Sequence, residues 1–218
     1  MQLIHVDEAI AVCVKPVGIS AEAGGLPDLL AETLGGQIYP VHRLDQAVGG
    51  VMVYARQAKA AAALSRAMQA GQLTKQYAAA VHGHPRPPEG RWEDLLWKDS
   101  RKNKVYVVSR PRKGVKPAAL AYRVLAEDGD SSLVWVQLFT GRSHQIRVQF
   151  ASRGHPLLGD HKYGSRDKRA SPALWSCRLS FPHPVSGKRM CFFYPPEGEN
   201  WERFPPEDRL PGSGYPFT

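Results

Sequence analysis

The sequence predicts an α+β fold: a single domain on a mixed, largely antiparallel β-sheet with a few flanking helices. Short apolar runs rich in β-branched residues outnumber the segments with a helical pattern, and most of them are separated by turns. No apolar stretch approaches the length needed to span a bilayer. Of the 218 residues, 43% are hydrophobic and 22% are charged, which is typical of a soluble globular protein.

The first part of the chain alternates predicted strands and helices. IHVDEAIAVCVKP reads as two short extended pieces around an acidic turn. GGLPDLLAETLGG has Pro near its start and Gly at both ends, which predicts one short helix. VMVYA (51–55) predicts a buried strand, and QAKAAAALSRAMQAG (57–71) a helix that ends at Gly71. LTKQYAAAVHG (73–83) is expected to be extended.

The middle of the chain is richer in proline and positive charge. HPRPPEGRW predicts a loop, and VYVV, flanked by charges, an edge strand. AALAYRVLAED and SSLVWVQLFT form a hairpin candidate with EDGDSS as its turn. We therefore expect a basic surface insertion at about residues 84–116.

The last third is expected to hold one helix and two strands. GRSHQIRVQFASRG (141–154) predicts a helix closed by Gly154, and ALWSCRLSF and RMCFFYP predict strands around a PHPVSGK turn. The expected catalytic domain covers residues 1–195, and the Pro- and Gly-rich tail 196–218 is expected to pack loosely.

The net charge of +9 favours a polyanionic partner. Lys and Arg number 29 against 20 Asp and Glu, and the segment from Lys98 to Lys116 holds eight basic residues and one acid. Nucleic acid is the first interpretation, with an anionic membrane surface or a solvated basic loop as alternatives. The three cysteines form no CxxC pair, so reduced thiols are expected. The N-terminus lacks the pattern of a signal peptide, which favours the cytoplasm.

Two segments carry a resemblance to a known family. HRLDQAVGGVMVYA (42–55) and TGRSHQIRVQFASRGHPLLGDHKYG (140–164) resemble the two signatures of the RluA-type pseudouridine synthases. LTKQYAAAVHG, VDEAIAVCVKPVGIS and LSFPHPVSGKR resemble further family segments in the same order, from about residue 4 to 195. Two departures stand out: Val48-Gly49-Gly50 replaces Thr-Ser-Gly, and Gln149 replaces a histidine.

The resemblance implies a pseudouridine synthase fold with a central active-site cleft, and an isomerase that flips a uridine out of RNA. Asp45 is the implied nucleophile or base. An adjacent cation lowers the pKa of a buried aspartate by roughly 1–3 units, and the resemblance assigns that role to Arg147. It assigns to Tyr77 either stacking on the uracil or removal of the final proton. The reaction requires no cofactor and no metal.

Arg43 is expected to enter the RNA, because residues i and i+2 of an extended chain point to the same side. Further positions in the two signatures are expected to bind substrate: His42, Leu44, Arg142, His144, Gln145 and Ile146. The expected partner is structured ribosomal or transfer RNA. We expect no membrane attachment, no obligatory protein partner and a monomer.

Other interpretations fit parts of the sequence. An inactive RNA-binding protein on the same scaffold is the main alternative. A hydrolase that uses Ser143, His144 and Asp45 lacks a GxSxG motif, and the histidines lack HxxxH or HExxH spacing for a metal. Asp160 is expected to hold a turn through its own side chain.

Overall fold

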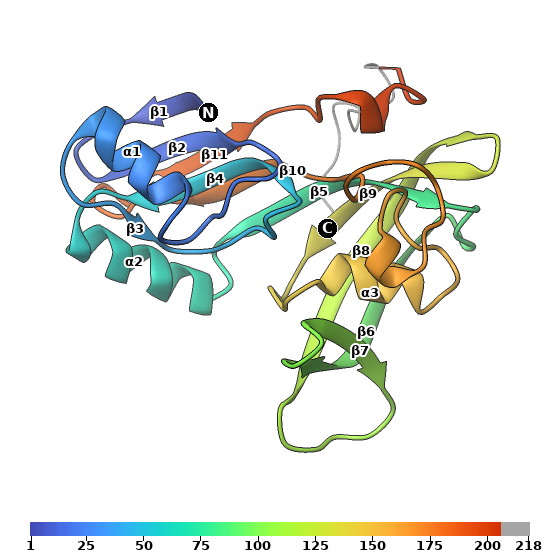
Figure 1. The fold of residues 1–218 in the computed structure, drawn as a ribbon. Coiled ribbons are helices and arrows are strands. Elements are labelled where there is room, and N and C mark those ends of the chain that lie inside the picture. The colour runs from blue at the N-terminus through green and yellow to red at the C-terminus, as the bar shows by residue number, and fades with distance from the viewer. Residues whose placement is uncertain (206–218) are drawn as a thin grey trace. The chain divides into compact units, whose positions relative to one another are not determined.

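Short strands and three helices make up the part of the chain that the structure, a computed structural model, describes: residues 1–205 (Figure 1). β4 (Gly49–Ala55) and β10 (Leu174–Pro182) run parallel, whereas the neighbouring pairs named below are antiparallel. The predicted α+β class with a mixed, largely antiparallel sheet is therefore confirmed. Residues 1–75 and 175–195 form one compact unit, and residues 76–174 form a second together with the segment from Pro196.

The first unit is a sheet in the order β1-β2-β4-β10, with β11 on β10 and β3 on β4. Its remaining elements are β1 (Gln2–Val6), β2 (Ile10–Lys15), α1 (Leu26–Leu34), β3 (Tyr39–Pro40), α2 (Ala58–Gln69) and β11 (Arg189–Phe193). β2 pairs antiparallel with both β1 and β4, and β11 with β10. Each of these elements except β3, which no segment predicted, lies within or beside the segment that predicted it.

Two features explain how the first unit folds. The predicted acidic turn between β1 and β2 forms because Asp7 accepts hydrogen bonds from the backbone N–H groups of Ala9 and Ile10, at 2.8 and 2.9 Å. α2 carries small and apolar residues on its inner face, and Leu64, which is fully buried, packs in one cluster with Val53 of β4. That packing anchors the strand that follows the HRLD segment.

The second unit has the strand order β5-β9-β8-β6-β7. Its elements are β5 (Thr74–His82, which begins in the first unit), β6 (Glu89–Asp99), β7 (Lys104–Val108), β8 (Val115–Asp128), β9 (Ser131–Leu138) and α3 (Gln145–Ala151). The predicted β8–β9 hairpin and the predicted edge strand β7 are both confirmed. The hairpin of β6 and β7 forms the lower, green end of this unit in Figure 1.

The region expected as a surface insertion supplies two strands of this sheet. β6 pairs with β8 from Glu89 to Trp97, and Leu96 and Val105 are buried. Of the predicted loop HPRPPEGRW, only the proline-rich part before Glu89 is a loop. From Glu89 on, the side chains alternate between the two faces of the sheet, as in a strand. The prediction relied on the many prolines and charges of this region, and composition does not record the alternation of side chains along a strand.

The beginning of the C-terminal tail is more tightly packed than expected. Trp201 and Phe204 are buried, and Asn200 donates a hydrogen bond to the Ser171 carbonyl at 3.1 Å. The rest of the predicted tail, residues 206–218, lies outside the described residues.

Helix α3 is shorter than the predicted helix at 141–154. His144 precedes it with φ +50°, in the left-handed region, so the helix cannot extend toward the N-terminus through that residue. The chain then turns at Gly154 with φ +83°.

Cys13 and Cys177 are buried, Cys191 is exposed, and all three are free thiols. Within residues 1–205, no helix is both long enough and apolar enough to cross a bilayer.

Candidate active site

Asp45 lies on a tight turn immediately before β4. The Val48 N–H donates a hydrogen bond to the Asp45 carbonyl at 2.9 Å and closes the turn. Leu44 is buried, Asp45 is half-buried, and Arg43 extends into solvent, where it contacts the Glu22 carboxylate at 3.3 Å. The turn therefore presents an acid at the start of a buried strand and an exposed cation two residues before it.

His42, a half-buried residue of the same segment, carries a neutral ring. The Val53 N–H donates to its Nε2 at 3.2 Å, so the neutral ring carries its proton on Nδ1. Burial, with a smaller contribution from Lys75, lowers the pKa of His42 to about 3. Nδ1 has no hydrogen-bond partner among the described groups. The ring thus braces β4 through one nitrogen and has a donor on the other.

The replacement of Thr-Ser by Val48-Gly49 has a structural counterpart. A Cβ atom at Gly49 would lie 2.3 Å from Cζ3 of the Trp175 ring, and Trp175 lies opposite Gly49 in the parallel ladder. The Trp175 side chain is almost fully buried. The indole ring therefore fills the space that a side chain at position 49 requires.

Arg147 lies on the buried face of α3 and makes a two-pronged ion pair with Asp160. Its Nε and Nη2 donate to the two Asp160 oxygens at 2.7 and 2.8 Å, and the two side chains are 8% and 1% exposed. The guanidinium also lies over the Tyr163 ring, 5.2 Å from its centre. Asp160 was expected to hold a turn through its own side chain; instead, its carboxylate balances a buried cation.

The sheet and the preceding turn fix α3 in place. Phe150 packs edge-on against Trp92, with ring centres 4.7 Å apart. The Gln145 amide accepts hydrogen bonds from Thr140 Oγ1 and the Arg142 N–H, and donates to the Ala119 carbonyl at 3.0 Å. All three of these hydrogen bonds are internal, so Gln145 is occupied in bracing the turn.

The other predicted residues of this segment differ in their exposure. Ile146 is buried, whereas Arg142 is half-buried and donates through Nε to the Pro117 carbonyl at 2.9 Å. His144 is held in its left-handed conformation by a 2.9 Å hydrogen bond between Nδ1 and the Tyr163 hydroxyl. Strained backbone of this kind is most common at functional sites.

Gln149, the second departure from the family pattern, has a hydrogen-bond partner of its own. Gln149 is fully buried and donates to the Asp94 carboxylate at 2.7 Å, and Arg153 binds the same carboxylate at 2.9 Å. This network ties α3 to β6.

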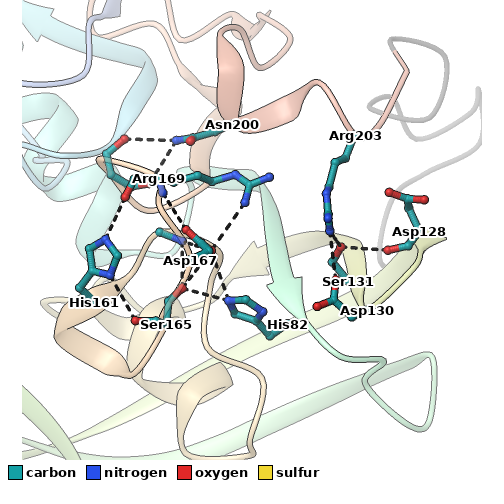
Figure 2. A network of polar contacts seen from close by, with 12 residues as sticks. His82, Asp128, Asp130, Ser131, His161, Ser165, Asp167, Arg169, Asn200 and Arg203 are labelled. Carbon is teal, nitrogen blue, oxygen red and sulfur yellow. Dashed lines mark hydrogen bonds and ion pairs between the residues drawn. The ribbon is translucent and has the colours of Figure 1, made fainter.

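A polar network fixes the loop that carries Asp160 (Figure 2). The Asp167 carboxylate accepts from the Gly159 N–H at 2.8 Å and from Ser165 Oγ at 3.0 Å, and His82 lies 3.3 Å away. Gly159 has φ +75°, and a Cβ there would lie 2.1 Å from the Ser171 carbonyl oxygen, so the loop requires glycine at that position. Asp160 follows directly and is held rigidly by this arrangement.

Tyr77 is buried on β5, in the second unit with Arg147. Asp45, Arg43, His42 and Leu44 belong to the first unit. The pairing of Asp45 with Arg147 and the central cleft therefore stay predictions from the sequence.

Two residues of these segments escaped the sequence prediction. No sequence pattern marks Asp160 as the partner of Arg147, and the motifs do not single out Lys15. The available signal for Lys15 was a cation that ends an otherwise apolar run, AVCVK, whose residues are all buried in β2. A charge inside a buried strand requires compensation, and that makes it a candidate for a functional site.

Comparison with known proteins identifies the family. The sequence model described as RNA pseudouridylate synthase matches residues 10–152. The chain belongs to the RNA pseudouridylate synthase family. It is 35% identical over 206 residues to the dual-specificity RNA pseudouridine synthase RluA of Escherichia coli K12, covering 88% of this chain and 92% of that protein. It is 33% identical to the ribosomal large subunit pseudouridine synthase D of Zymomonas mobilis, covering 88% and 68%.

Solved structures agree on the fold of this RNA pseudouridylate synthase. The human RNA pseudouridylate synthase domain containing 1 superposes with a TM-score of 0.79 at 24% identity, covering 89% of this chain and 83% of that one. The human RNA pseudouridylate synthase domain containing 4 gives 0.74 at 24% identity, covering 88% and 87%. The resemblance and the reaction class drawn from the sequence are thus confirmed.

The close approach of Gly49 to Trp175 leads to a prediction for this pseudouridine synthase. Gly49→Ser should lower the free energy of unfolding by about 1–3 kcal/mol, because the new side chain overlaps a buried ring. The decrease should be smaller in a Trp175→Ala background, where the ring is absent. Urea denaturation of both single variants and the double variant measures this coupling. Purely additive decreases would contradict the overlap.

The Arg147–Asp160 pair leads to a second prediction. Asp160→Ala should lower the free energy of unfolding by about 3–5 kcal/mol, because it leaves a buried guanidinium without its counter-charge. Glu93→Gln is the matched control: it removes the carboxylate of the Arg91–Glu93 pair, whose side chains are 59% and 68% exposed, and should change little. Urea denaturation measures the free energy of unfolding of both variants. Equal decreases would show that the buried pair contributes no more to stability than the exposed pair.

Proposed function

We propose that this chain isomerises a specific uridine to pseudouridine in structured ribosomal or transfer RNA, with Asp45 as nucleophile or base. The observation that supports the proposal is the turn that presents Asp45 at the start of β4. It occurs in a chain that is 35% identical to RluA of Escherichia coli. That relative is named as dual-specificity and as an RNA pseudouridine synthase, and the Zymomonas mobilis relative as a synthase of the ribosomal large subunit.

The reaction breaks the bond between the ribose and N1 of uracil, turns the base and rejoins it through C5. The ionised Asp45 carboxylate starts the reaction at the sugar, either by attacking it or by removing a proton. Water must be excluded so that the freed sugar is not hydrolysed. Nothing is oxidised or reduced, so the proposal includes no cofactor and no metal.

In this proposal Arg147 is the cation that keeps Asp45 ionised, and Tyr77 acts on the uracil. Arg147 supplies a fixed, always-charged group, and Tyr77 either stacks on the uracil or removes the C5 proton. Tyr77→Phe keeps the ring and removes the hydroxyl, so the activity of that variant distinguishes the two roles of Tyr77.

Arg43 is the residue placed to enter the RNA. Its side chain is about half exposed and its partner Glu22 is more so, and an exposed pair of this kind separates at little cost. A planar guanidinium fills the gap left by a flipped base, or binds the neighbouring phosphates. His42, whose Nδ1 is buried, supports the same segment through the hydrogen bond that its Nε2 accepts from the Val53 N–H.

The proposed RNA-binding surface is the hairpin of β6 and β7 together with residues 109–114, which lead from β7 to β8. Arg112 lies over the Trp97 ring at 4.6 Å, and Lys104 lies over Tyr106 at 5.8 Å, so cations and aromatic faces alternate along it. Lys102 and Arg110 are exposed beside them. Positive charge with aromatic faces suits phosphate binding and base stacking in single-stranded RNA.

A monomer that acts in the cytoplasm without an obligatory protein partner completes the proposal. These three points rest on the sequence alone.

The identity of the catalyst is tested by mapping pseudouridines in total RNA from a strain that lacks this gene. Wild-type protein should restore the missing site, and Asp45→Asn should not, because the amide keeps the shape but removes the negative charge. RNA affinity of the variant should stay unchanged. A wild-type protein that binds RNA but restores no site would favour the inactive alternative, and an active Asp45→Asn would remove Asp45 as the catalyst.

The RNA-binding surface is tested by changing Lys102, Lys104, Arg110 and Arg112 to Gln. The slope of log affinity against log salt concentration should fall by about 0.7–0.9 for each phosphate that the variant no longer neutralises. The charge-matched control compares Lys102→Gln/Arg110→Gln with Lys59→Gln/Arg66→Gln on α2, whose residues are also exposed. Equal slopes for the two double variants would show that this region is a solvated basic surface that does not bind RNA specifically.

A further inference from the structure

Tyr163 is the residue at which three parts of the second unit meet. It is the last residue of η1, a 3₁₀ turn formed by His161–Tyr163. Its hydroxyl lies 2.8 Å from the Val105 nitrogen of β7 and 2.9 Å from His144 Nδ1, and the Arg147 guanidinium lies over its ring at 5.2 Å. One side chain thus contacts the edge strand of the hairpin, the residue before α3 and the buried arginine.

The contact with Val105 satisfies a backbone group of the edge strand. β7 is the last of the described strands in the second sheet, and an edge strand has N–H groups that no further strand accepts. The Val105 N–H donates to the Tyr163 hydroxyl. Lys162 adds a second link, because its Nζ donates at 3.1 Å to the carbonyl of Asn103, in the turn between β6 and β7. The hairpin is therefore tied to η1.

The contact with His144 acts on the start of α3. His144 has φ +50°, a left-handed conformation that a residue other than glycine keeps only where its surroundings hold it. Its carbonyl accepts the first hydrogen bond of the helix, from the Val148 N–H at 2.9 Å. Arg147 lies in this first turn of the helix. The conformation of His144 therefore sets the direction in which the helix starts and the position of the guanidinium.

We propose that Tyr163 is a positioning residue that couples RNA bound at the β6–β7 hairpin to Arg147. The inference rests on the proposed function, in which this hairpin binds RNA and Arg147 keeps Asp45 ionised. The hydroxyl transmits the coupling, because it contacts both the edge strand and His144. A displacement of β7 moves the hydroxyl and, through it, the start of the helix.

The Tyr163 ring adds a second route between the two sites. Lys104, a cation of the proposed RNA-binding surface, has its Nζ 5.3 Å from the centre of the same ring that lies under Arg147. An RNA phosphate that binds Lys104 competes with the ring for this cation. The ring also packs against the apolar cluster that includes Val105 and Val148. Phenylalanine would provide the same packing, so packing alone gives no reason for the hydroxyl.

The first test needs no activity assay. Tyr163→Phe keeps the ring and removes the hydroxyl. NMR should show amide hydrogen exchange at Val105 faster by about tenfold, together with backbone shifts of His144 that leave the left-handed range. Tyr122→Phe is the matched control, since it removes a buried hydroxyl of the same unit that donates to the Pro87 carbonyl at 2.7 Å, and it should change neither signal. Unchanged His144 shifts in Tyr163→Phe would overturn the inference.

The second test measures the coupling during turnover. Tyr163→Phe should lower kcat by about tenfold, and should leave the KM for RNA within about twofold, because the basic residues are unchanged. Lys102→Gln/Arg110→Gln should lower kcat in the wild-type background and cause no further loss in Tyr163→Phe, while raising KM equally in both. Tyr122→Phe should keep the wild-type kcat. Additive losses of kcat, or a hairpin variant with the wild-type kcat, would contradict the coupling.

The two tests distinguish failure of the inference from failure of the proposed function. A wild-type protein that forms no pseudouridine would overturn the function, while the NMR comparison would still decide whether the hydroxyl joins β7 to His144. If Tyr163→Phe does not fold, oligocytidylate, a single-stranded RNA without uridine, is added to wild type and to Lys102→Gln/Arg110→Gln. It should shift the His144 resonances of the wild type and shift them less in the variant; the absence of a shift in the wild type would refute the coupling.

Discussion

Burying a cation is unfavourable unless its hydrogen bonds and its charge are both compensated, and this constraint shapes both units of the chain. In the second unit, Arg147 receives a carboxylate, Asp160, on a loop that is itself fixed by Asp167 and Gly159. In the first unit, Lys15 receives three carbonyls, which accept its three hydrogen bonds. The first solution places an anion against the cation; the second surrounds the cation with neutral hydrogen-bond acceptors.

The turn that carries Asp45 is shaped by packing where the family pattern has hydroxyl groups. Thr and Ser side chains would stabilise such a turn through local hydrogen bonds. Here Val48 is buried, Gly49 admits the Trp175 ring, and Lys15 holds the neighbouring carbonyl of Gln46. The turn is thus supported by an aromatic ring on one strand and a cation on another. The departure from the pattern changes how the acid is held and leaves the acid itself in place.

Helix α3 shows how a short element is held accurately. Seven residues are too few to be stable as an isolated helix, so tertiary contacts must hold it. Phe150 packs against the Trp92 ring of β6, Gln149 binds Asp94, and Gln145 closes the preceding turn. The left-handed His144 at its start is kept in place by Tyr163, which also lies under the Arg147 guanidinium. The contacts that fix the helix therefore also fix the buried arginine.

The sequence by itself determined the fold class, the family, most of the elements and the choice of Asp45, Tyr77 and Arg147 as candidates. Periodicity, turn residues and motifs are local properties, and the β8–β9 hairpin, α2 and β7 followed from them. Only the tertiary structure decided that residues 89–99 form a strand of the second sheet, that Arg147 is bound by Asp160, and that Trp175 occupies the space beside Gly49. It also showed that Lys15 reaches the Asp45 turn. These contacts join residues between 13 and 126 positions apart, and no local pattern records which distant side chain will compensate a buried charge or fill the space left by a missing side chain.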